Sequence, residues 1–438
     1  MTNETVYDVA VVGGGFAGLS AARALGELGH SCVLLEARDR LGGRTFYRRF
    51  AETDVEVEFG GTWVAPATQP HVAAEIARYG LGLIQSPEPE TFHWTVDGEL
   101  RVGNPFGKRE RAGFERASYE LLKAAERVDH ARPLDSQDLD DLDVSLEDFF
   151  ERLALPTGVR DFLGSWGVLY GGCPGDQNSL LHVVLDVIEY GNSITAFLDA
   201  LDDQLALGTR HLAELMARDS RAEQRLSSPV SEIQQRPDGV LLTTDGRESF
   251  SARACVVALP VNVWSSVRFT PELNPGKRAV AAVGHAGHAA KVWVLARNTP
   301  PNVIALAPDT RLAWLSTERH TPDGDLLVGF GVGDDINVTD KEQVAYAVRQ
   351  LCPTAEVVAV DGHDWTRDPY SRGAWAWYRP GQLTRHHGDL TASEGRLIFA
   401  GSDIAATWMS WIEGALASGA RAAEDANRLL AAASHATA

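Results

Sequence analysis

Three glycines and one acid near the N-terminus have the types and spacing that bind a phosphate-bearing ligand. Gly13, Gly15 and Gly18 form the pattern G-x-G-x-x-G, and Glu36 lies 36 − 13 = 23 residues after the first of them. In this pattern the glycines allow a tight turn, close approach of the backbone to a pyrophosphate, and close packing of a helix on a strand. A carboxylate about 20 residues further on accepts hydrogen bonds from ribose hydroxyls. The sequence therefore predicts dinucleotide binding; the alternative is a glycine-rich turn that binds nothing.

Two further glycine pairs extend this chemistry. Arg40 and Arg44 flank Gly42 and Gly43, which is typical of a loop around a second phosphate edge, although a solvated turn has the same composition. Residues 60–63, Gly-Gly-Thr-Trp, follow a short alternating strand and predict another close approach of the backbone.

Other polar clusters favour structure over chemistry. His285 and His288 are three residues apart, but no third ligand accompanies them, so we interpret them as part of a polar loop. Residues 135–148 are densely acidic and are interpreted as a solvated connection, with Ser145 capping a helix at 146–153. The four cysteines form no C-x-x-C pair, which argues against a zinc site or a disulfide framework. We predict no metal site.

The elements around the first glycines predict a β-α-β unit. Residues 7–12 form an apolar run that suits a strand covered on both faces. A helix from residue 16 to about 28 ends at Gly29, and residues 32–35 form the second strand. A further helix is expected at 71–79, closed by Gly80.

The chain then changes composition and returns. Helix formers dominate residues 110–215, with an aromatic and apolar segment at 162–170. Alternating residues with turn signals predict hairpins over 232–250, and residues 255–259 form an apolar strand. A last apolar strand meets Gly401 and Asp403, and a helix from 412 to about 430 follows. Small residues in its first turns permit close packing, and its N-terminus could stabilise negative charge on a bound ring.

Composition limits the function classes. The chain has 438 residues, 40 Lys and Arg against 60 Asp and Glu, and a formal net charge of −20, which disfavours nucleic acid and anionic lipid as partners. No stretch approaches the roughly 18 consecutive apolar residues of a membrane span. The N-terminus lacks a basic and an apolar region, so we expect no signal peptide and a cytoplasmic location.

With these motifs assembled, the sequence resembles the flavin-dependent amine oxidase family, in particular the bacterial branch that includes 6-hydroxynicotine oxidases. The resemblance covers nearly the whole chain. Beside the glycine pattern with Glu36, it rests on motifs whose order and spacing are specific: 41–45 Leu-Gly-Gly-Arg-Thr, 60–63 Gly-Gly-Thr-Trp, 258–260 Ala-Leu-Pro, Lys291, 365–370 Trp-x-x-Asp-Pro-Tyr, 401–403 Gly-Ser-Asp and 411–414 Trp-Ile-Glu-Gly.

The resemblance implies an extended FAD across the first domain. Glu36 would hold the adenosine ribose, Arg44 the pyrophosphate, Val230 would lie by the adenine, and Asp403 would meet the ribityl chain. The residues assigned to the cofactor in this way are Gly13, Gly15, Phe16, Ala17, Gly18, Glu36, Ala37, Arg38, Gly43, Arg44, Gly60, Gly61, Thr62, Trp63, Val230, Trp365, Gly401, Ser402, Asp403 and Ile412.

The resemblance also implies a catalytic set. Lys291 aligns with a lysine that contacts flavin N5 through a water, and Trp375 and Trp411 align with two aromatic residues that form a cage for the amine. Trp375 and Trp377 would share a face if the chain alternates there. Substrate contacts are assigned to Trp166, Leu169, Tyr170 and Trp314.

Two departures from the family pattern refine these expectations. Covalently flavinylated relatives carry a cysteine where this chain has Ala374, so we predict non-covalent FAD. Nicotine-oxidising relatives carry an amide near the position of Leu169, and its absence here favours a different, apolar amine.

The implied fold class is α/β with α+β elements: a Rossmann-like FAD-binding domain (1–80, 205–285 and 385–438) and a discontinuous substrate domain of mixed sheet plus helices (81–204 and 286–384). The implied reaction is oxidation of a primary or secondary amine to an imine by hydride transfer to flavin N5, with imine hydrolysis and dioxygen reduced to H₂O₂. The alternatives are an L-amino-acid oxidase, for which Arg372 is the candidate carboxylate clamp, a nicotine-type cyclic amine oxidase, a flavin desaturase acting on a C–C bond, and a flavin-bound scaffold protein. Because relatives are often dimers, a homodimer is a further expectation.

Overall fold

The N-terminal strand, helix and strand form the β-α-β unit that the glycine pattern predicts. In the computed structural model, β1 (Val6–Val12) leads into α1 (Phe16–Glu27), and the chain returns through β2 (Cys32–Leu35). β1 lies between β2 and β13 (Ser249–Val257) and is parallel to both, so its residues 9–12 are buried. Coverage on both faces explains the uninterrupted apolar run.

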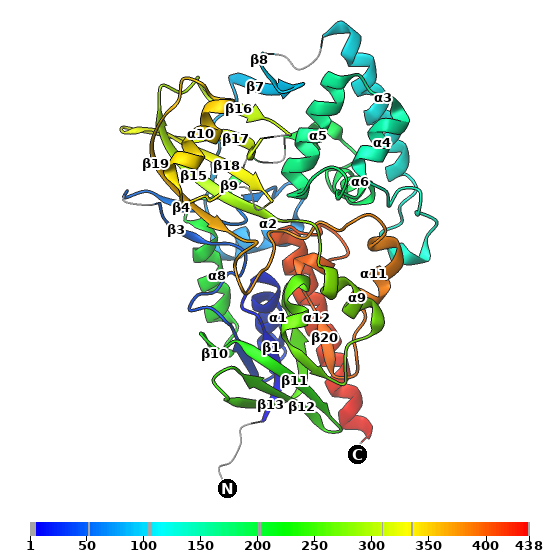
Figure 1. Ribbon diagram of the computed structural model, residues 1–438. Coiled ribbons are helices and arrows are strands. Elements are labelled where there is room, and N and C mark those ends of the chain that lie inside the picture. The colour runs from blue at the N-terminus through cyan, green and yellow to red at the C-terminus, as the bar shows by residue number, and fades with distance from the viewer. Residues whose placement is uncertain are drawn as a thin grey trace.

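Two large sheets organise the molecule. The structure describes residues 6–50, 53–103, 107–199, 201, 203–308, 310–333 and 336–436. Figure 1 shows the sheet that contains β1 in the lower half and the second sheet, flanked by helices, in the upper half. This arrangement confirms the predicted α/β class.

The lower sheet has eight strands in the order β10-β2-β1-β13-β12-β11-β14, with β20 paired to β13. The pairs β11–β12 and β12–β13 are antiparallel, as the hairpin signals predict, and the other pairs are parallel. Its remaining strands are β10 (Glu223–Arg225), β11 (Val230–Arg236), β12 (Gly239–Thr244), β14 (Arg268–Thr270) and β20 (Leu397–Phe399).

The upper sheet has seven strands in the order β19-β15-β18-β17-β16-β7-β8. Only the pair β16–β7 is parallel among its described pairs, so the sheet is mixed, as expected. The strands are β7 (Thr91–Val96), β8 (Glu99–Val102), β15 (Ala289–Arg297), β16 (Val303–Leu306), β17 (Leu312–Thr321), β18 (Gly324–Val332) and β19 (Glu356–Asp364).

Helices cover the upper sheet from both sides (Figure 1). α3 (Lys108–Ala125), α4 (Leu146–Leu153), α5 (Thr157–Gly171) and α6 (Leu180–Glu189) form a cluster beside it, and α10 (Lys341–Leu351) packs against β17 and β19. The Ser145 hydroxyl accepts the Asp148 N–H at 3.0 Å, which confirms the predicted cap of α4. Such a cap stabilises a helix by about 1 kcal/mol.

The acidic segment at 135–148 is more than a solvated connection. Asp143 is buried; its carboxylate accepts hydrogen bonds from the Ser179 hydroxyl (2.7 Å) and the Thr384 N–H (3.0 Å). Asp135 accepts the Gly388 N–H at 2.9 Å. The sequence interpretation was wrong for Asp143, because its partners come from distant segments that a local pattern does not contain, whereas Asp135 is exposed as expected.

The last helix, α12 (Ile412–Ala436), is longer than the prediction and lies against α1. A Cβ at Gly419 would stand 2.1 Å from the Ala17 carbonyl oxygen, so only glycine permits this approach. The Ser20 hydroxyl donates to the Leu416 carbonyl oxygen at 2.8 Å. The predicted small residues therefore bring the N-terminal halves of the first and last helices together.

The remaining elements connect these layers. They are β3 (Tyr47–Arg49), β4 (Glu56–Glu58), β5 (Trp63–Val64), α2 (Pro70–Tyr79), β6 (Leu83–Gln85), α7 (Ile194–Leu198), β9 (Asp203–Leu205), α8 (Gly208–Asp219), α9 (Pro275–Val283), α11 (Leu383–Thr391) and three short 3₁₀ turns at Leu134–Ser136, Val261–Ser266 and Ser402–Ile404. No helix among the described residues has the length and apolarity needed to cross a bilayer.

Candidate functional site

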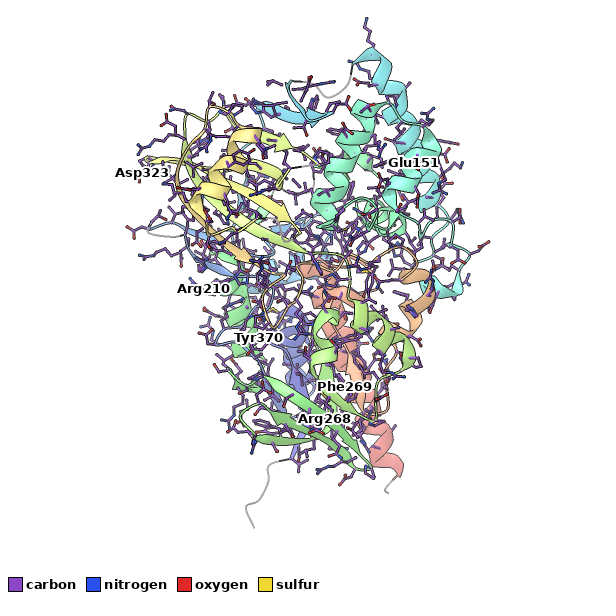
Figure 2. The ribbon with its side chains drawn as sticks, viewed as in Figure 1. Glu151, Arg210, Arg268, Phe269, Asp323 and Tyr370 are labelled. Atoms are coloured by element: carbon purple, nitrogen blue, oxygen red, sulfur yellow. The ribbon has the colours of Figure 1, made fainter. Side chains whose placement is uncertain are left out.

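A cavity of about 460 Å³ lies where the two sheets meet, lined by residues from both ends of the chain and from its middle. Tyr370, labelled in Figure 2, is one of its wall residues. Of the residues predicted from the sequence, those that line the cavity are Gly13, Gly15, Phe16, Ala17, Glu36, Ala37, Arg38, Gly43, Arg44, Gly60, Gly61, Val230, Lys291, Trp365, Arg372, Trp375, Gly401, Ser402, Trp411 and Ile412. The structure thus brings together residues that span 400 positions of sequence.

The first end of the cavity is formed by the glycine turn. Gly13 has φ +107°, a conformation that favours glycine, and a Cβ at Gly18 would stand 1.9 Å from the Gly13 carbonyl oxygen. Gly18 therefore packs α1 on β1 and does not reach the cavity wall. Phe16 and Ala17 do line it, and their N–H groups, in the first turn of α1, have no intrahelical partner. The helix thus presents donors and its positive dipole end to the cavity.

Glu36 stands at the end of β2 and is held by the backbone. Its two carboxylate oxygens accept the Gly14 N–H (2.6 Å) and the Arg38 N–H (2.8 Å). Arg38 donates to Asp368 (2.5 Å) and to the Ser371 hydroxyl (2.9 Å), which ties β2 to a turn at 368–373. Val230, which was predicted, lines the cavity in this region. Ser228, Pro229 and Asp245 line it beside Val230 and were not predicted from the sequence.

Arg44 bridges the cavity wall to a buried acid. Its guanidinium donates to the Ala374 carbonyl oxygen (2.7 Å), to the Ser402 hydroxyl (3.1 Å) and to the Asp403 carboxylate. The second oxygen of Asp403 accepts the Val261 N–H at 2.9 Å. Burial opposes ionisation of Asp403, but the charge of Arg44 and these hydrogen bonds hold its pKa below the ordinary value. Asp403 does not line the cavity itself and lies behind Arg44, whereas Gly401 and Ser402 are part of the cavity wall.

Lys291 enters the other end of the cavity from β15. Its ammonium donates to the Gly60 carbonyl oxygen (3.1 Å) and to the Thr62 hydroxyl, and Nζ lies 4.4 Å from the centre of the Trp63 ring. Burial lowers the pKa of Lys291 to about 8, although the nearby carboxyl groups of Glu58 and Glu318 oppose this shift. Thr62 and Trp63 therefore support the lysine from below and do not line the cavity themselves.

Aromatic rings enclose this end. Trp375, Trp411 and Phe330 line the cavity, and the rings of Phe330 and Trp375 meet edge to face with centroids 5.2 Å apart. The Trp375 indole N–H donates to the Tyr170 carbonyl oxygen (2.5 Å), and the Trp411 ring meets the Tyr190 ring edge to face with centroids 5.9 Å apart. Each indole is therefore held from outside the cavity.

Trp377 does not share the position of Trp375. Residues 375–379 have no regular strand conformation, so the expected alternation fails. The Trp377 ring is buried, stacks on His182 at 3.9 Å and donates to Asn178 Oδ1 at 2.7 Å. His285, expected in a polar loop, is also fully buried, and burial lowers its pKa to about 3. Residues 284–288 do form a loop, as expected, but His285 is buried within it.

The residues assigned to the substrate lie one layer behind the wall. Trp166 and Tyr170 stack on each other in α5 with centroids 5.9 Å apart, and Tyr170 stacks on Phe197 at 4.3 Å. Trp314, in β17, stacks on Phe330 at 5.4 Å. Leu169 is buried in the same layer. None of the four lines the cavity, so their role as substrate contacts stays a prediction.

Sequence reasoning missed several wall residues. Phe330 is the clearest: it lies directly opposite Lys291 in the β15–β18 pairing and is flanked by Gly329 and Gly331. That Gly-Phe-Gly pattern is a signal of close approach that could have drawn attention to it. Ser371 and Ser410 also line the cavity, as does Tyr370, which ends the motif at 365–370.

The described part of the chain contains no group of three or more His, Cys, Asp or Glu side chains that could hold a metal ion. Its four cysteines are free and buried. Ala374 lines the cavity beside Trp375.

Comparison with known proteins gives one consistent result. The sequence pattern of the family described as flavin containing amine oxidoreductase matches residues 16–427. The chain is 37% identical to nicotine dehydrogenase from Pseudomonas putida, over 97% of this chain and 89% of that protein. It is 34% identical to (S)-6-hydroxynicotine oxidase from Paenarthrobacter nicotinovorans, over 94% and 97% of the two chains. Its fold is similar to that of putrescine oxidase bound to putrescine, with a TM-score of 0.86 and 24% identity over 97% of this chain and 100% of that chain.

Proposed function

The chain belongs to the flavin-containing amine oxidoreductase family, and on that premise we propose that it oxidises an apolar amine with non-covalently held FAD. Family membership makes it a flavin-dependent enzyme that acts on amines; the substrate class and the mode of FAD binding are the proposal. One observation carries it: a single cavity joins the glycine turn at one end to Lys291 and three aromatic rings at the other.

The donors along the cavity fit FAD. The first turn of α1 offers unpaired N–H groups for a pyrophosphate, and the Glu36 carboxylate lies at the end of β2, where a ribose would lie. At the other end α12 begins at Ile412, which also lines the cavity, so a second helix N-terminus faces the same space. That dipole suits the electron-rich edge of a reduced flavin ring.

Bound FAD would accept a hydride from the amine α-carbon and pass two electrons to dioxygen, so that amine and O₂ give imine and H₂O₂, and water then hydrolyses the imine. The chain's own residues prepare this step. Phe330, Trp375 and Trp411 exclude water, which favours the neutral form of a bound amine, the form with a free lone pair. Lys291, held by Gly60 and Thr62, would position a water beside the ring.

The apolar wall supports an amine without a second charge. Among the cavity-lining residues, the carboxylates are those of Glu36 and Asp245, and both lie in the glycine-turn half with Val230. A second ammonium group on the substrate would therefore lack a partner near the aromatic rings. The Asn178 side chain donates a hydrogen bond to the Gly167 carbonyl oxygen and accepts one from the Trp377 indole. It therefore does not present its amide to the cavity near Leu169.

A nicotine-type cyclic amine is the second candidate. The two relatives named above are a nicotine dehydrogenase and a 6-hydroxynicotine oxidase, and a wall of three aromatic rings also suits a flat ring. One of these relatives is named a dehydrogenase and the other an oxidase, so the names do not agree on the electron acceptor. We propose dioxygen as the acceptor of this protein. Ala374 at the cavity wall, in place of a cysteine, supports the proposal of non-covalent FAD. A cytoplasmic location and a homodimer complete the proposal.

An anaerobic titration of the purified protein tests these points. Cyclohexylamine, nicotine, 6-hydroxynicotine, putrescine and L-leucine would each be added under nitrogen while the flavin spectrum is recorded. We expect bleaching by an apolar monoamine, and recovery with peroxide when air is admitted. Bleaching by putrescine alone or by L-leucine alone contradicts the apolar-amine proposal, and absence of bleaching by any amine favours the scaffold or C–C desaturase alternative. Acid precipitation should leave the yellow colour in the supernatant if FAD is non-covalent.

A further inference from the structure

Trp375 lies in an irregular stretch, residues 373–377, which we call the wall segment. The Ala374 N–H donates to the Gly287 carbonyl oxygen at 2.9 Å. A Cβ at Gly287 would stand 2.0 Å from the Trp375 carbonyl oxygen, so the wall segment lies directly on the loop 284–288. The place of the Trp375 ring in the cavity therefore depends on how the wall segment is fixed against this loop.

The Asn262 side chain joins the wall segment to the same loop. Its Nδ2 donates to the carbonyl oxygen of Arg372, the residue before the wall segment, at 2.8 Å. Its Oδ1 accepts the His285 N–H, also at 2.8 Å. A carbonyl needs a donor and an N–H needs an acceptor, so only one orientation of the amide satisfies both partners. One side chain thus holds two segments that are distant in sequence.

The Asn262 amide is closely enclosed. The residue is 7% exposed. A Cβ at Gly373 would stand 2.7 Å from Nδ2, and a Cβ at Gly284 would stand 2.8 Å from Oδ1, so glycine at both positions lets the two backbones reach the amide. The neighbouring Val261 N–H donates to the Asp403 carboxylate at 2.9 Å, which anchors the backbone of this turn. The amide therefore has little freedom to move apart from the segments that it joins.

The carbonyl that Asn262 holds belongs to a strained residue. Arg372 has φ 50°, in the left-handed region that residues other than glycine rarely adopt. Strained residues persist where neighbouring groups hold them, and they concentrate at functional sites. Arg44 and Ser410 also donate to the main chain of the wall segment, but both line the cavity, whereas Asn262 does not. Substitution of Asn262 therefore leaves the side chains of the cavity wall in place.

We propose that Asn262 is a positioning residue for amine oxidation, because it fixes the start of the wall segment and so sets the Trp375 ring against the amine. This inference rests on the proposed function. The Trp375 indole itself donates to the main-chain carbonyl of Tyr170, so that contact cannot be removed by substitution of the acceptor, whereas the Asn262 amide can. Since displacement of a positioning group by about 1 Å can cost a factor of about 100 in rate, loss of the amide should slow substrate oxidation.

Asn262→Ala removes both hydrogen bonds of the amide. Its limiting rate of anaerobic flavin reduction by the best amine should fall at least about tenfold. The Kd for FAD should stay within about threefold, because Asn262 does not line the cavity. Asn274→Ala is the matched control: the Asn274 side chain also accepts one N–H (Lys277, 2.8 Å) and donates to one carbonyl oxygen (Asp389, 3.0 Å), but away from the wall segment. This control should be reduced at the wild-type rate.

A double variant shows whether Asn262 acts through Trp375. Trp375→Ala has no ring to position, so adding Asn262→Ala to it should change the reduction rate less than about twofold. A loss that persists undiminished in the Trp375→Ala background overturns the proposal. So does an Asn262→Ala rate that stays within about threefold of the wild type.

A spectroscopic readout separates this inference from the proposed function. In the flavin-loaded protein labelled with 5-fluorotryptophan, the ¹⁹F resonance of Trp375 is assigned by its disappearance in Trp375→Phe. We expect this resonance to move in Asn262→Ala and to stay in place in Asn274→Ala. An unmoved resonance in Asn262→Ala overturns the proposal whatever the substrate is, and a moved resonance with an unchanged reduction rate overturns the catalytic part.

If no amine reduces the wild-type flavin, the proposed function fails, and the resonance alone still decides whether Asn262 places the ring. Should Asn262→Ala fail to fold, Asn262→Ser replaces it, because its side chain is one bond shorter and does not reach both the Arg372 carbonyl oxygen and the His285 N–H.

Discussion

Lys291 gives a prediction whose size follows from its burial. Lys291 is 1% exposed, and its pKa falls from 10.5 to about 8 on folding. Below pH 8 both the folded and the unfolded chain carry the charge, so the cost of burying it is fully present. Between pH 8 and 10.5 the unfolded chain binds more protons, so the stability of the protein rises with pH. At about 1.4 kcal/mol per pH unit, this cost is roughly 3 kcal/mol at pH 7 and roughly 1.4 kcal/mol at pH 9.5.

The substitution Lys291→Met removes this dependence. When the pH rises from 7 to 9.5, the wild type should therefore gain about 2 kcal/mol of stability that the variant does not gain. For a chain of 438 residues, an unfolding entropy of about 2.1 cal/mol/K per residue converts this to about 2 °C in melting temperature.

The assay is thermal melting of the flavin-free protein at the two pH values, because bound cofactor would add its own linkage. Lys341→Met, which replaces an exposed lysine of α10, is the control and should shift the melting temperature equally at both pH values. A Lys291→Met difference that is the same at pH 7 and pH 9.5 would refute the reasoning, because it would mean that the lysine is not desolvated as its contacts indicate.

Three further substitutions probe the cavity. Glu36→Gln replaces the charged acceptor of the Gly14 N–H and should raise the Kd for FAD about 10- to 100-fold, measured by flavin fluorescence, since a hydrogen bond to a charged group contributes about 1.5–3 kcal/mol. Arg44→Met leaves the buried Asp403 without its cation and should cost about 3–5 kcal/mol in denaturant unfolding, partly recovered by adding Asp403→Asn; an unchanged midpoint would contradict the buried ion pair. Lys291→Met should slow flavin reoxidation more than flavin reduction in stopped-flow, and equal slowing would count against its assignment.

The parts of the site that are local in sequence could be predicted. The glycine turn and Glu36 lie within one β-α-β unit, and the chemistry of each residue depends on neighbours less than 25 positions away. The bounds of α1 and α4 likewise followed from their terminal residues. Lys291 could be assigned only through the resemblance, because a lysine at the start of a strand has no distinctive local pattern.

The parts that depend on distant pairing could not be predicted. Phe330 reaches the cavity because β18 pairs with β15, which places it opposite Lys291. The Tyr190 ring meets the Trp411 ring edge to face across 221 positions of sequence, and nothing in its local sequence indicates that partner. The expected pairing of Trp375 with Trp377 failed because the local chain is irregular, so side-chain alternation does not apply.

The position of β1 has a consequence for how the protein folds. β1 emerges first during synthesis, yet its neighbour β13 begins at Ser249 and the helix that covers α1 begins at Ile412. At about 5–20 residues per second, β1 waits roughly 12–50 s for β13 and longer for α12. Pairings that close such long loops form slowly. Val9, Val11 and Leu19 would stay exposed on the ribosome until then. Because exposed apolar residues favour aggregation, we expect the yield of active protein to depend on translation speed or on a chaperone.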